Sequence, residues 1–340
     1  MLNNPLDFEK DIAELDALIA ELKQMGRDPS VRADAAQKGI DIEARIAEVE
    51  AAREERLRQI FANLTPWNQV QMARHPQRPY TLDYIRMLCD DFFELYGDRI
   101  NADDPAIVGG LARFQGRPVV VLGHQKGRDL KERQQRNFGS ARPAGFRKAL
   151  RLMKLAEKFR KPLIIFVDTP AAEANLMAEE EGISTTIAVN LREMIMLRVP
   201  IVVAVIGEGG SGGALGIAVG DRVLMLEHAI YSVIPPEGCA AILWKDRNRA
   251  AEAAEALKLT ARHALEFGLV DAIVPEPIGG AHRDPQAMAA TLKAAIAEHL
   301  SALLALSPDA LTQARYAKFR QMGRWQELPA VHPEVEALET

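Results

Sequence analysis

The chain has 340 residues, of which 48% are hydrophobic and 26% charged, the composition of a globular protein that can bury a sizeable core. Its formal net charge of −5 provides no excess positive field, which argues against general binding to nucleic acid or to an anionic membrane surface. For this length we expect one large domain with an appendage.

The cysteines and the N-terminus indicate the compartment. Cys89 and Cys239 lie far apart and without C-x-x-C spacing, so they predict neither a disulfide framework nor a zinc site within the chain. The first residues lack a basic region followed by an apolar one, and no uninterrupted apolar run approaches the roughly 20 residues of a bilayer span. We therefore expect a cytoplasmic protein without a membrane segment.

Residues 1–64 predict a helical arm. Apolar residues recur at alternating spacings of four and three, the pattern of an amphipathic helix over 8–25: Phe8, Ile12, Leu15, Ile19 and Leu22. A second charged helix is predicted from about Val31 to Leu64. Since no residue with catalytic potential falls on either helix, we interpret the pair as a hairpin that serves dimerisation or docking.

Capping residues and a short turn mark the elements after the arm. Thr65 is expected to cap a helix that has proline at its first position. Another helix is expected over 81–96, where a glycine follows it. Two β-rich runs, 106–114 and 117–123, flank a two-residue turn and predict a hairpin.

The densest basic cluster of this acidic chain follows the hairpin. It consists of Lys126, Arg128, Lys131, Arg133 and Arg136. These side chains could simply cover a solvated helix face. Alternatively, they contact an anionic cofactor, because Arg and Lys in a glycine-bounded loop pair with phosphoryl oxygens. The residues alone leave both interpretations open.

A glycine-rich turn follows the strongest strand signal of the chain. The β-branched run from Pro200 to Ile206 predicts a buried strand of a parallel sheet. Five glycines lie between Gly207 and Gly213, and a small-residue helix is expected from Ala214. The first N–H groups of such a helix are unpaired and partly positive, so the turn suits an anion or an oxyanion.

Two side-chain patterns compete for this turn. The dinucleotide pattern G-x-G-x-x-G is matched by Gly207, Gly209 and Gly212, with Glu227 at the distance of a ribose-binding acid. The hydrolase pattern G-x-S-x-G is also present. Its residues are Gly209, Ser211 and Gly213, followed in the usual order by Asp271 and His282.

A third interpretation of the turn uses the backbone only. Gly212 and Gly213 offer N–H groups to a developing oxyanion, and Ser211 is a small residue or a helix cap. Several predicted strands precede the turn, whereas a Rossmann fingerprint normally sits on the first strand. No H-G-G-G-like loop precedes it either, so both side-chain patterns lose ground.

The remaining predicted elements repeat paired strands followed by a helix. Helices are expected over 143–160, 178–197, 236–244, 250–257, 260–268 and 286–306. Strands are expected over 162–167, 223–226, 229–233 and 269–274. The polar residues 325–340 are expected to form a loosely held tail.

Eight segments occur in one order along most of the chain. They are RHPQRPYTLDYIR from Arg74, GHQKGRD from Gly123, RQQRNFG from Arg133, FRKALRLM from Phe146, NLREM from Asn190, VIGEGGSGGAL from Val205, YSVIPPEGCAAILWK from Tyr231 and EPIGGAHRDP from Glu276. Together they resemble the α subunits of bacterial acetyl-CoA carboxylase carboxyltransferases. Spread over this length, they are far more specific than a single glycine pattern.

The resemblance implies an α/β fold of the crotonase-like (ClpP/crotonase) type, a spiral of ββα units, over residues 65–324 after the helical hairpin. It implies a transferase that moves the carboxyl group of carboxybiotin, presented on a carrier protein, to acetyl-CoA. The product would be malonyl-CoA, the first step of fatty acid synthesis. The backbone amides of Gly212 and Gly213 would form the oxyanion hole, and this subunit would need no metal.

The resemblance also implies partners and binding residues. The partners would be a β subunit with a zinc ribbon in an α2β2-type assembly, the biotin carboxyl carrier protein and biotin carboxylase. We expect the chain to be inactive alone, because carboxyl transfer needs a second oxyanion site for the thioester. Residues that would bind substrate or cofactor are Gly209, Gly210, Ser211, Lys126, Arg128, Arg133, Arg136, Pro236, Glu237 and Gly238.

One segment departs from the family pattern. Where the family has D-T-P-G-A-Y-P-G and then A-E-E-R-G-Q, this chain has DTPAAEANLMAEEEGI from Asp168. Ala171 and Asn175 cannot take every φ that glycine can, Glu173 replaces an aromatic residue, and Glu181 replaces a cation. The departure leaves three alternatives: altered handling of biotin, a diverged paralogue with another acyl-CoA acceptor, and a non-catalytic structural subunit.

Overall fold

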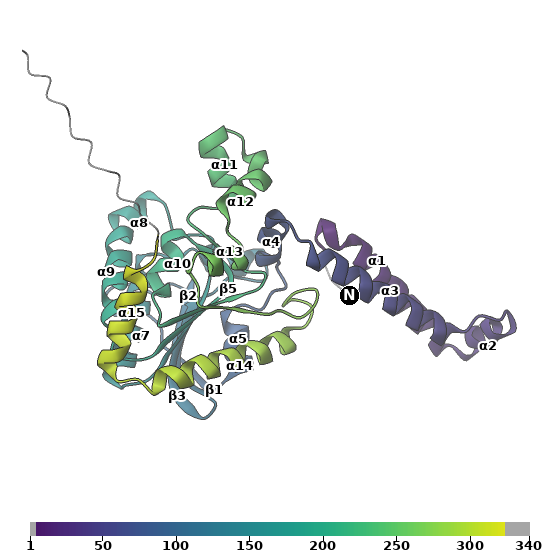
Figure 1. The fold of residues 1–340 in the computed structure, drawn as a ribbon, viewed down its shortest axis with the longest axis horizontal. Helices are drawn as coiled ribbons and strands as arrows, with labels where there is room; N and C mark the ends of the chain where they lie inside the picture. The colour runs from purple at the N-terminus through teal and green to yellow at the C-terminus, as the bar shows by residue number, and fades with distance from the viewer. Residues whose placement is uncertain (1–4, 324–340) are drawn as a thin grey trace, which may run out of the picture.

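The computed structural model describes residues 5–323, so the predicted tail over 325–340 lies outside the described residues. Its centre is an eight-stranded sheet in the order β1-β2-β3-β4-β5-β6-β8, with β7 paired to β5 (Figure 1). The strands are β1 (Cys89–Glu94), β2 (Ile107–Phe114), β3 (Arg117–His124), β4 (Leu163–Thr169), β5 (Ile201–Gly210), β6 (Arg222–Leu226), β7 (Ile230–Ser232) and β8 (Ala272–Val274). The first three strands pair antiparallel, and every later pair is parallel.

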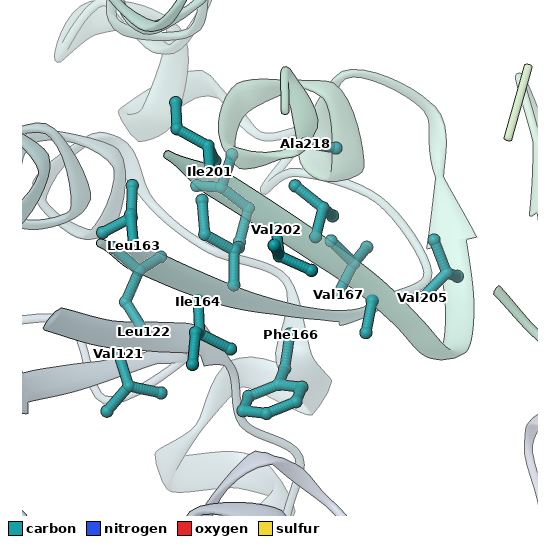
Figure 2. Packing of buried hydrophobic residues seen from close by; sticks show 14 of the residues in the cluster. Val121, Leu122, Leu163, Ile164, Phe166, Val167, Ile201, Val202, Val205 and Ala218 are labelled. Carbon is teal, nitrogen blue, oxygen red and sulfur yellow. The ribbon is translucent and has the colours of Figure 1, made fainter. Parts of the chain in front are cut away.

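Strands β4 and β5 form the centre of the core, because all of their residues are buried. Leu163 of β4 lies opposite Ile201 of β5, and Ile164 lies opposite Val202. Figure 2 shows these side chains packed together, with Leu122 of β3 beside them. Burial on both faces explains why the two strands are continuous apolar runs instead of alternating ones.

Helices cover both faces of the sheet. On one face α7 (Pro143–Lys158), α9 (Ile183–Met196), α10 (Ser211–Ala218) and α15 (Pro308–Arg320) pack together (Figure 1). On the other face α5 (Thr81–Leu88) packs against α14 (Pro285–Leu304). The smaller elements are α4 (Pro66–Ala73), α6 (Leu130–Gln135), α8 (Leu176–Glu180), α11 (Pro236–Trp244), α12 (Ala250–Leu257), α13 (Ala261–Glu266), η2 (Asn137–Gly139) and η3 (Arg247–Arg249).

Helix α14 is, within residues 5–323, the one helix that is long and apolar enough to cross a membrane by length and composition. It contacts α5, β5 and β8. Its buried residues belong mainly to the core: Met288, Ala289, Leu292, Ile296, Leu300 and Leu303. One side of α14 therefore contributes to the core, and 33% of its apolar window is buried.

The N-terminal arm is a helical hairpin that extends away from the sheet (Figure 1). It consists of η1 (Asp7–Glu9), α1 (Lys10–Arg27), α2 (Pro29–Gln37) and α3 (Ile42–Ala62), and α1 packs along α3. The single helix predicted over 31–64 is wrong, because Gly39 with a φ of +72° separates α2 from α3. Asp41 caps α3 by accepting hydrogen bonds from the N–H groups of Glu43 and Ala44.

Two further predicted helices are interrupted. The helix over 81–96 ends at Leu88, because residues 89–94 pair with β2 as an antiparallel strand, Cys89 opposite Phe114. The helix over 178–197 is divided into α8 and α9 at Gly182, which has a φ of +80°. In contrast, the hairpin of β2 and β3, the cap at Thr65, and helices α11 and α12 are confirmed.

Candidate active site

The glycine turn, residues 207–213, joins β5 to α10. Strand β7 pairs with the last three residues of β5, Glu208 to Gly210, and β4 pairs as far as Thr169. Helix α10 begins at Ser211, whose φ of +50° lies in the left-handed region. This reversal places the first N–H groups of α10 at the carboxyl end of the sheet, where α/β proteins bind ligands.

Two glycines of the turn are required because neighbouring backbone lies against them. A Cβ added at Gly210 would be 1.9 Å from the carbonyl oxygen of Pro170, and one at Gly213 would be 2.5 Å from the carbonyl carbon of Ala171. At Gly212 the nearest atom is a side-chain methyl at 3.5 Å, an ordinary contact. The turn is therefore backed by residues 170–172, and Gly212 is partly exposed.

The side chains of the hydrolase pattern are not brought together. Asp271 accepts a hydrogen bond from Lys318 Nζ at 2.5 Å, and His282 Nε2 lies 3.3 Å from Glu9 Oε1. Among the residues that the structure describes, no hydrogen bond joins Ser211 to either of them. The serine therefore lacks the oriented base that would activate it.

The dinucleotide pattern also lacks its structural context. The turn follows β5 instead of the first strand of the sheet. Glu227, the predicted ribose-binding acid, accepts a hydrogen bond from the N–H of Glu276 at 3.0 Å. Its carboxylate thus already has a partner within the chain, which leaves the backbone interpretation of the turn.

Five charged side chains meet at the beginning of the glycine turn, around Glu208. We call them the charge cluster: Arg74, Lys126, Asp168, Glu208 and Glu237. Lys126 Nζ forms ion pairs with Asp168 Oδ1 at 2.7 Å and with Glu208 Oε1 at 2.8 Å. Arg74 donates from Nε to Glu208 Oε2 at 2.7 Å and from a terminal nitrogen to Glu237 at 2.5 Å. Positive and negative charges therefore alternate from Asp168 to Glu237.

Lys126 and Glu208, at the centre of the charge cluster, are both charged near neutral pH. Burial alone would raise the pKa of the Glu208 carboxyl, but the charges of Lys126 and Arg74 outweigh burial and lower it. Burial would lower the pKa of Lys126, but Asp168 and Glu208 raise it. Neither group therefore exchanges a proton near neutral pH.

The structure separates the basic residues that the sequence grouped as anion contacts. Lys126 lies in the charge cluster. Arg128 forms an ion pair with Asp83, and its guanidinium lies 4.2 Å from the centre of the Tyr80 ring. Their role as anion contacts stays a prediction.

Arg133 and Arg136 lie on and directly after helix α6. Arg136 forms an ion pair with Glu132 at 3.0 Å and donates to the carbonyl of Pro105 at 2.9 Å. Arg133 donates to the carbonyl of Gly127 at 3.2 Å and has no carboxylate partner within residues 5–323. Arg133 therefore differs from Arg128 and Arg136, which are both paired with a carboxylate.

The predicted binding residues of helix α11 are linked to the turn through one arginine. Pro236 is the first residue of α11 and is buried, and Gly238 packs near Ile234. Glu237 lies between them and accepts a hydrogen bond from Arg74, which also donates to Glu208. The start of α11 and the glycine turn are therefore connected by two ion pairs.

The segment that departs from the family pattern fits its backbone without strain. Neither Ala171 nor Asn175 has a positive φ, and the Asn175 side chain caps α8. The N–H of Glu173 donates to the carbonyl of Ala141 at 2.9 Å, and its carboxylate accepts from Asn175 at 2.8 Å. Glu181 is exposed. The backbone at 170–172 keeps its contact with the turn. The substitution at 173 leaves Glu173 Oε2 buried without a hydrogen-bond partner among the described residues, 3.8 Å from Arg142 Nε.

His124 lies at the end of β3 with its ring fully buried next to the backbone of Gly213. Sequence reasoning did not single it out, because a lone histidine after an apolar strand carries no functional signal. Burial and the charge of Lys126 lower the pKa of His124 from 6.5 to about 3, which the Gly213 backbone opposes. The ring is therefore neutral near pH 7.

The depressed pKa of His124 predicts acid sensitivity. Below pH 6.5 His124 binds a proton in the unfolded chain but stays neutral in the folded chain. The free energy of unfolding therefore falls as pH falls. At about pH 5 this residue should cost about 2 kcal/mol of unfolding free energy relative to neutral pH. Urea unfolding of the wild type and of His124→Gln at both pH values measures this difference. Equal pH dependence in the two proteins would contradict it.

Three buried side chains where the arm meets the core are of metal-binding type: Glu9, His75 and His282, with donor atoms within 4.8 Å of one another. The two histidine rings stack at 3.9 Å. His75 Nδ1 accepts from the N–H of Gln77 at 3.2 Å, and Arg283 Nε lies 3.5 Å from Glu9 Oε1. A cation thus already faces the carboxylate, so the cluster fits an ion-paired contact that holds the arm.

Comparison with known proteins gives one consistent family. Residues 5–323 match the family model described as acetyl co-enzyme A carboxylase carboxyltransferase-like. Acetyl-coenzyme A carboxylase carboxyl transferase subunit alpha of Thioalkalivibrio sulfidiphilus is 54% identical over 322 residues, 95% of this chain and 98% of that one. The protein of the same name from Xanthomonas campestris pv. campestris is 55% identical over 323 residues, again 95% and 98% of the two chains.

Solved structures share the fold at lower sequence identity. Transcarboxylase 12S superposes with a TM-score of 0.55 at 19% identity, covering 75% of this chain and 44% of that chain. A Pseudomonas malonate decarboxylase hetero-dimer superposes with a TM-score of 0.52 at 18% identity, covering 64% and 89%. At these identities the likeness concerns the fold alone, and it confirms the crotonase-like α/β fold.

Proposed function

This chain belongs to the family of acetyl-CoA carboxylase carboxyltransferase α subunits, and we propose that it transfers a carboxyl group from carboxybiotin to acetyl-CoA. The observation that carries this proposal is the glycine turn. Its backbone offers the N–H groups of Gly212 and Gly213 at the carboxyl end of the sheet, backed by residues 170–172. The close relatives share one name, which favours this function over a diverged paralogue.

The turn supplies electrostatic stabilisation rather than a side-chain base. Carboxybiotin, presented on a carrier protein, supplies the carboxyl group, and negative charge develops on its ureido oxygen as that group departs. The N–H groups of Gly212 and Gly213 would donate to this oxygen. Because neighbouring backbone fixes Gly213, the donors are oriented before the substrate arrives, and one such donor typically contributes ~10²–10³-fold in rate.

The chain provides one half of the reaction. Within residues 5–323 it offers one glycine-rich strand-to-helix turn, whereas acetyl-CoA needs a second site that stabilises the charge on its thioester oxygen. We propose that a β subunit with a zinc ribbon supplies this site in an α2β2-type assembly. The carrier protein and biotin carboxylase would complete the system in the cytoplasm.

Reconstitution tests the proposal. The chain should be co-purified with a β subunit and assayed for malonyl-CoA formation from carboxybiotin and acetyl-CoA. The pair should turn over, and either chain alone should not. Robust malonyl-CoA formation by this chain alone would contradict the proposal that a β subunit supplies the second site. Normal assembly of the pair without turnover would indicate that this chain is a non-catalytic structural subunit.

Ser211 is expected to be dispensable as a nucleophile. It has no hydrogen bond to His282 or Asp271 within the part of the chain that the structure describes, so Ser211→Ala should keep most of the turnover of the reconstituted pair. A fluorophosphonate probe, which reacts with activated serines, should leave the protein unlabelled. Labelling that Ser211→Ala abolishes would revive the hydrolase hypothesis.

A further inference from the structure

We propose that Lys126 is a positioning residue for the glycine turn, acting through Asp168 and Glu208. The inference rests on the proposed function for its catalytic consequence, but it concerns a residue that the family resemblance placed among the substrate contacts. Its ammonium group forms ion pairs with the two carboxylates at 2.7 and 2.8 Å. We infer that this group joins two strand ends instead of meeting the substrate.

The two carboxylates lie near the ends of neighbouring strands, Asp168 in β4 and Glu208 in β5. Asp168 lies at the end of β4, and its Oδ1 also accepts the backbone N–H of Glu208 at 2.9 Å. The same carboxylate fills the space beside Gly207, where an added Cβ would be 2.3 Å from Oδ1. Lys126 therefore neutralises a carboxylate that touches the backbone of β5 at two successive residues.

The backbone beyond Glu208 has little freedom to absorb a shift. Gly209 lies against the ring of Tyr231, where an added Cβ would be 2.5 Å from a ring carbon. Gly210 lies against the carbonyl of Pro170, and Ser211 adopts a positive φ. A displacement at Glu208 is thus passed along the chain to the N–H groups of Gly212 and Gly213.

Stability alone does not explain this arrangement. The Lys126 side chain is 13% exposed and that of Glu208 is 7% exposed, so both charges are largely desolvated. Buried ion pairs are often no more stabilising than apolar residues of the same volume. The location of this ion pair at the beginning of the turn therefore points to positioning.

His124 and Lys126 both lie close to the turn. His124 is the last residue of β3, and Lys126 follows two residues later in the loop. His124 lies next to the backbone of Gly213, while Lys126 reaches Glu208. Of these two residues, Lys126 is the one that holds a residue of the turn through an ion pair, with Glu208.

The test compares three variants in the reconstituted α–β pair. Lys126→Met should lower kcat on the order of 10²-fold while the KM for acetyl-CoA changes little, because a small misplacement of catalytic groups has this effect. Lys126→Arg keeps the positive charge. Its kcat should be at least tenfold higher than that of Lys126→Met, on the order of one tenth of the wild-type kcat.

Lys148→Met is the matched control. Lys148 is also a buried lysine, paired with Asp103 at 2.6 Å, but it lies on α7 and has no contact with the charge cluster among the described residues. This variant should lose thermal stability as Lys126→Met does and yet keep the kcat of its folded fraction. Equal kcat in the two folded variants would overturn the proposal.

Amide hydrogen exchange separates this inference from the proposed function. Exchange over residues 207–213 should be faster in Lys126→Met than in Lys148→Met, whatever the protein catalyses. If the wild-type pair forms no malonyl-CoA, the proposed function fails while the exchange comparison still decides the positioning role. Unchanged exchange over the turn in Lys126→Met would refute it.

Discussion

Replacing Gly213 with valine is expected to lower kcat of the reconstituted pair at least on the order of 10²-fold, the usual effect of losing one oxyanion donor. A Cβ at this position would lie 2.5 Å from both the carbonyl carbon of Ala171 and the nitrogen of Ala172. Those atoms are backbone, so they cannot rotate away as a side chain does. The helix start must move, and the two N–H groups move with it.

Gly212→Ala and Gly26→Val are the matched controls. At both positions the added Cβ would meet its nearest neighbour at 3.5 Å, and neither glycine has a positive φ. Gly212→Ala should therefore be much milder than Gly213→Val, although both lie in the turn. Gly26 lies in the arm, so Gly26→Val should leave kcat unchanged. Steady-state rates for the three variants check the expectation, and an active Gly213→Val would refute the backbone mechanism.

Removing the Arg78 guanidinium is expected to lower the unfolding free energy by about 3–5 kcal/mol, the usual cost of leaving a buried charge unpaired. Arg78 is 1% exposed and donates to both carboxylate oxygens of Glu276, at 2.8 and 2.6 Å. It also donates to the carbonyl of Ile206. Burial would raise the pKa of Glu276, but Arg78 and its other partners lower it to about 2.

Chemical denaturation of Arg78→Met measures this loss. The control is Arg58→Met, because the ion pair of Arg58 with Glu54 is more than half exposed on both sides and should contribute at most about 0.5 kcal/mol. The double variant Arg78→Met/Glu276→Gln should regain part of the stability, since it removes the unpaired charge. A similar loss in Arg58→Met and Arg78→Met would contradict the burial argument.

Local sequence signals predicted those features that depend on a few neighbouring residues. The glycine turn, the hairpin of β2 and β3 and the cap at Thr65 follow from residue types at fixed spacing. The helix predicted over 81–96 failed beyond Leu88, because residues 89–94 obtain their backbone partners from β2, a segment not adjacent in sequence. The helix α15, capped by Ser307, was not predicted at all.

The charge cluster shows why the site was only partly predictable. Lys126 and Glu208 are 82 residues apart, and Arg74 and Glu237 are 163 apart, so no local pattern links them. The sequence left two interpretations of the basic residues open, a solvated helix face and contact with an anionic cofactor. The structure shows that carboxylates of the same chain already occupy that position.

The topology of β5 has a consequence for how the chain folds. Its neighbours β4, β6 and β7 are all parallel to it, and each is separated from it by intervening helix or turn. Pairing of parallel strands requires closure of the long connection between them, and the chain loses this entropy before the strand contacts form. Such sheets are therefore slow to fold. Until β6 has been synthesised, the apolar run from Ile201 to Ile206 lacks one of its hydrogen-bonded neighbours. One edge of this central strand is therefore unpaired during that part of synthesis, and unpaired strand edges favour aggregation.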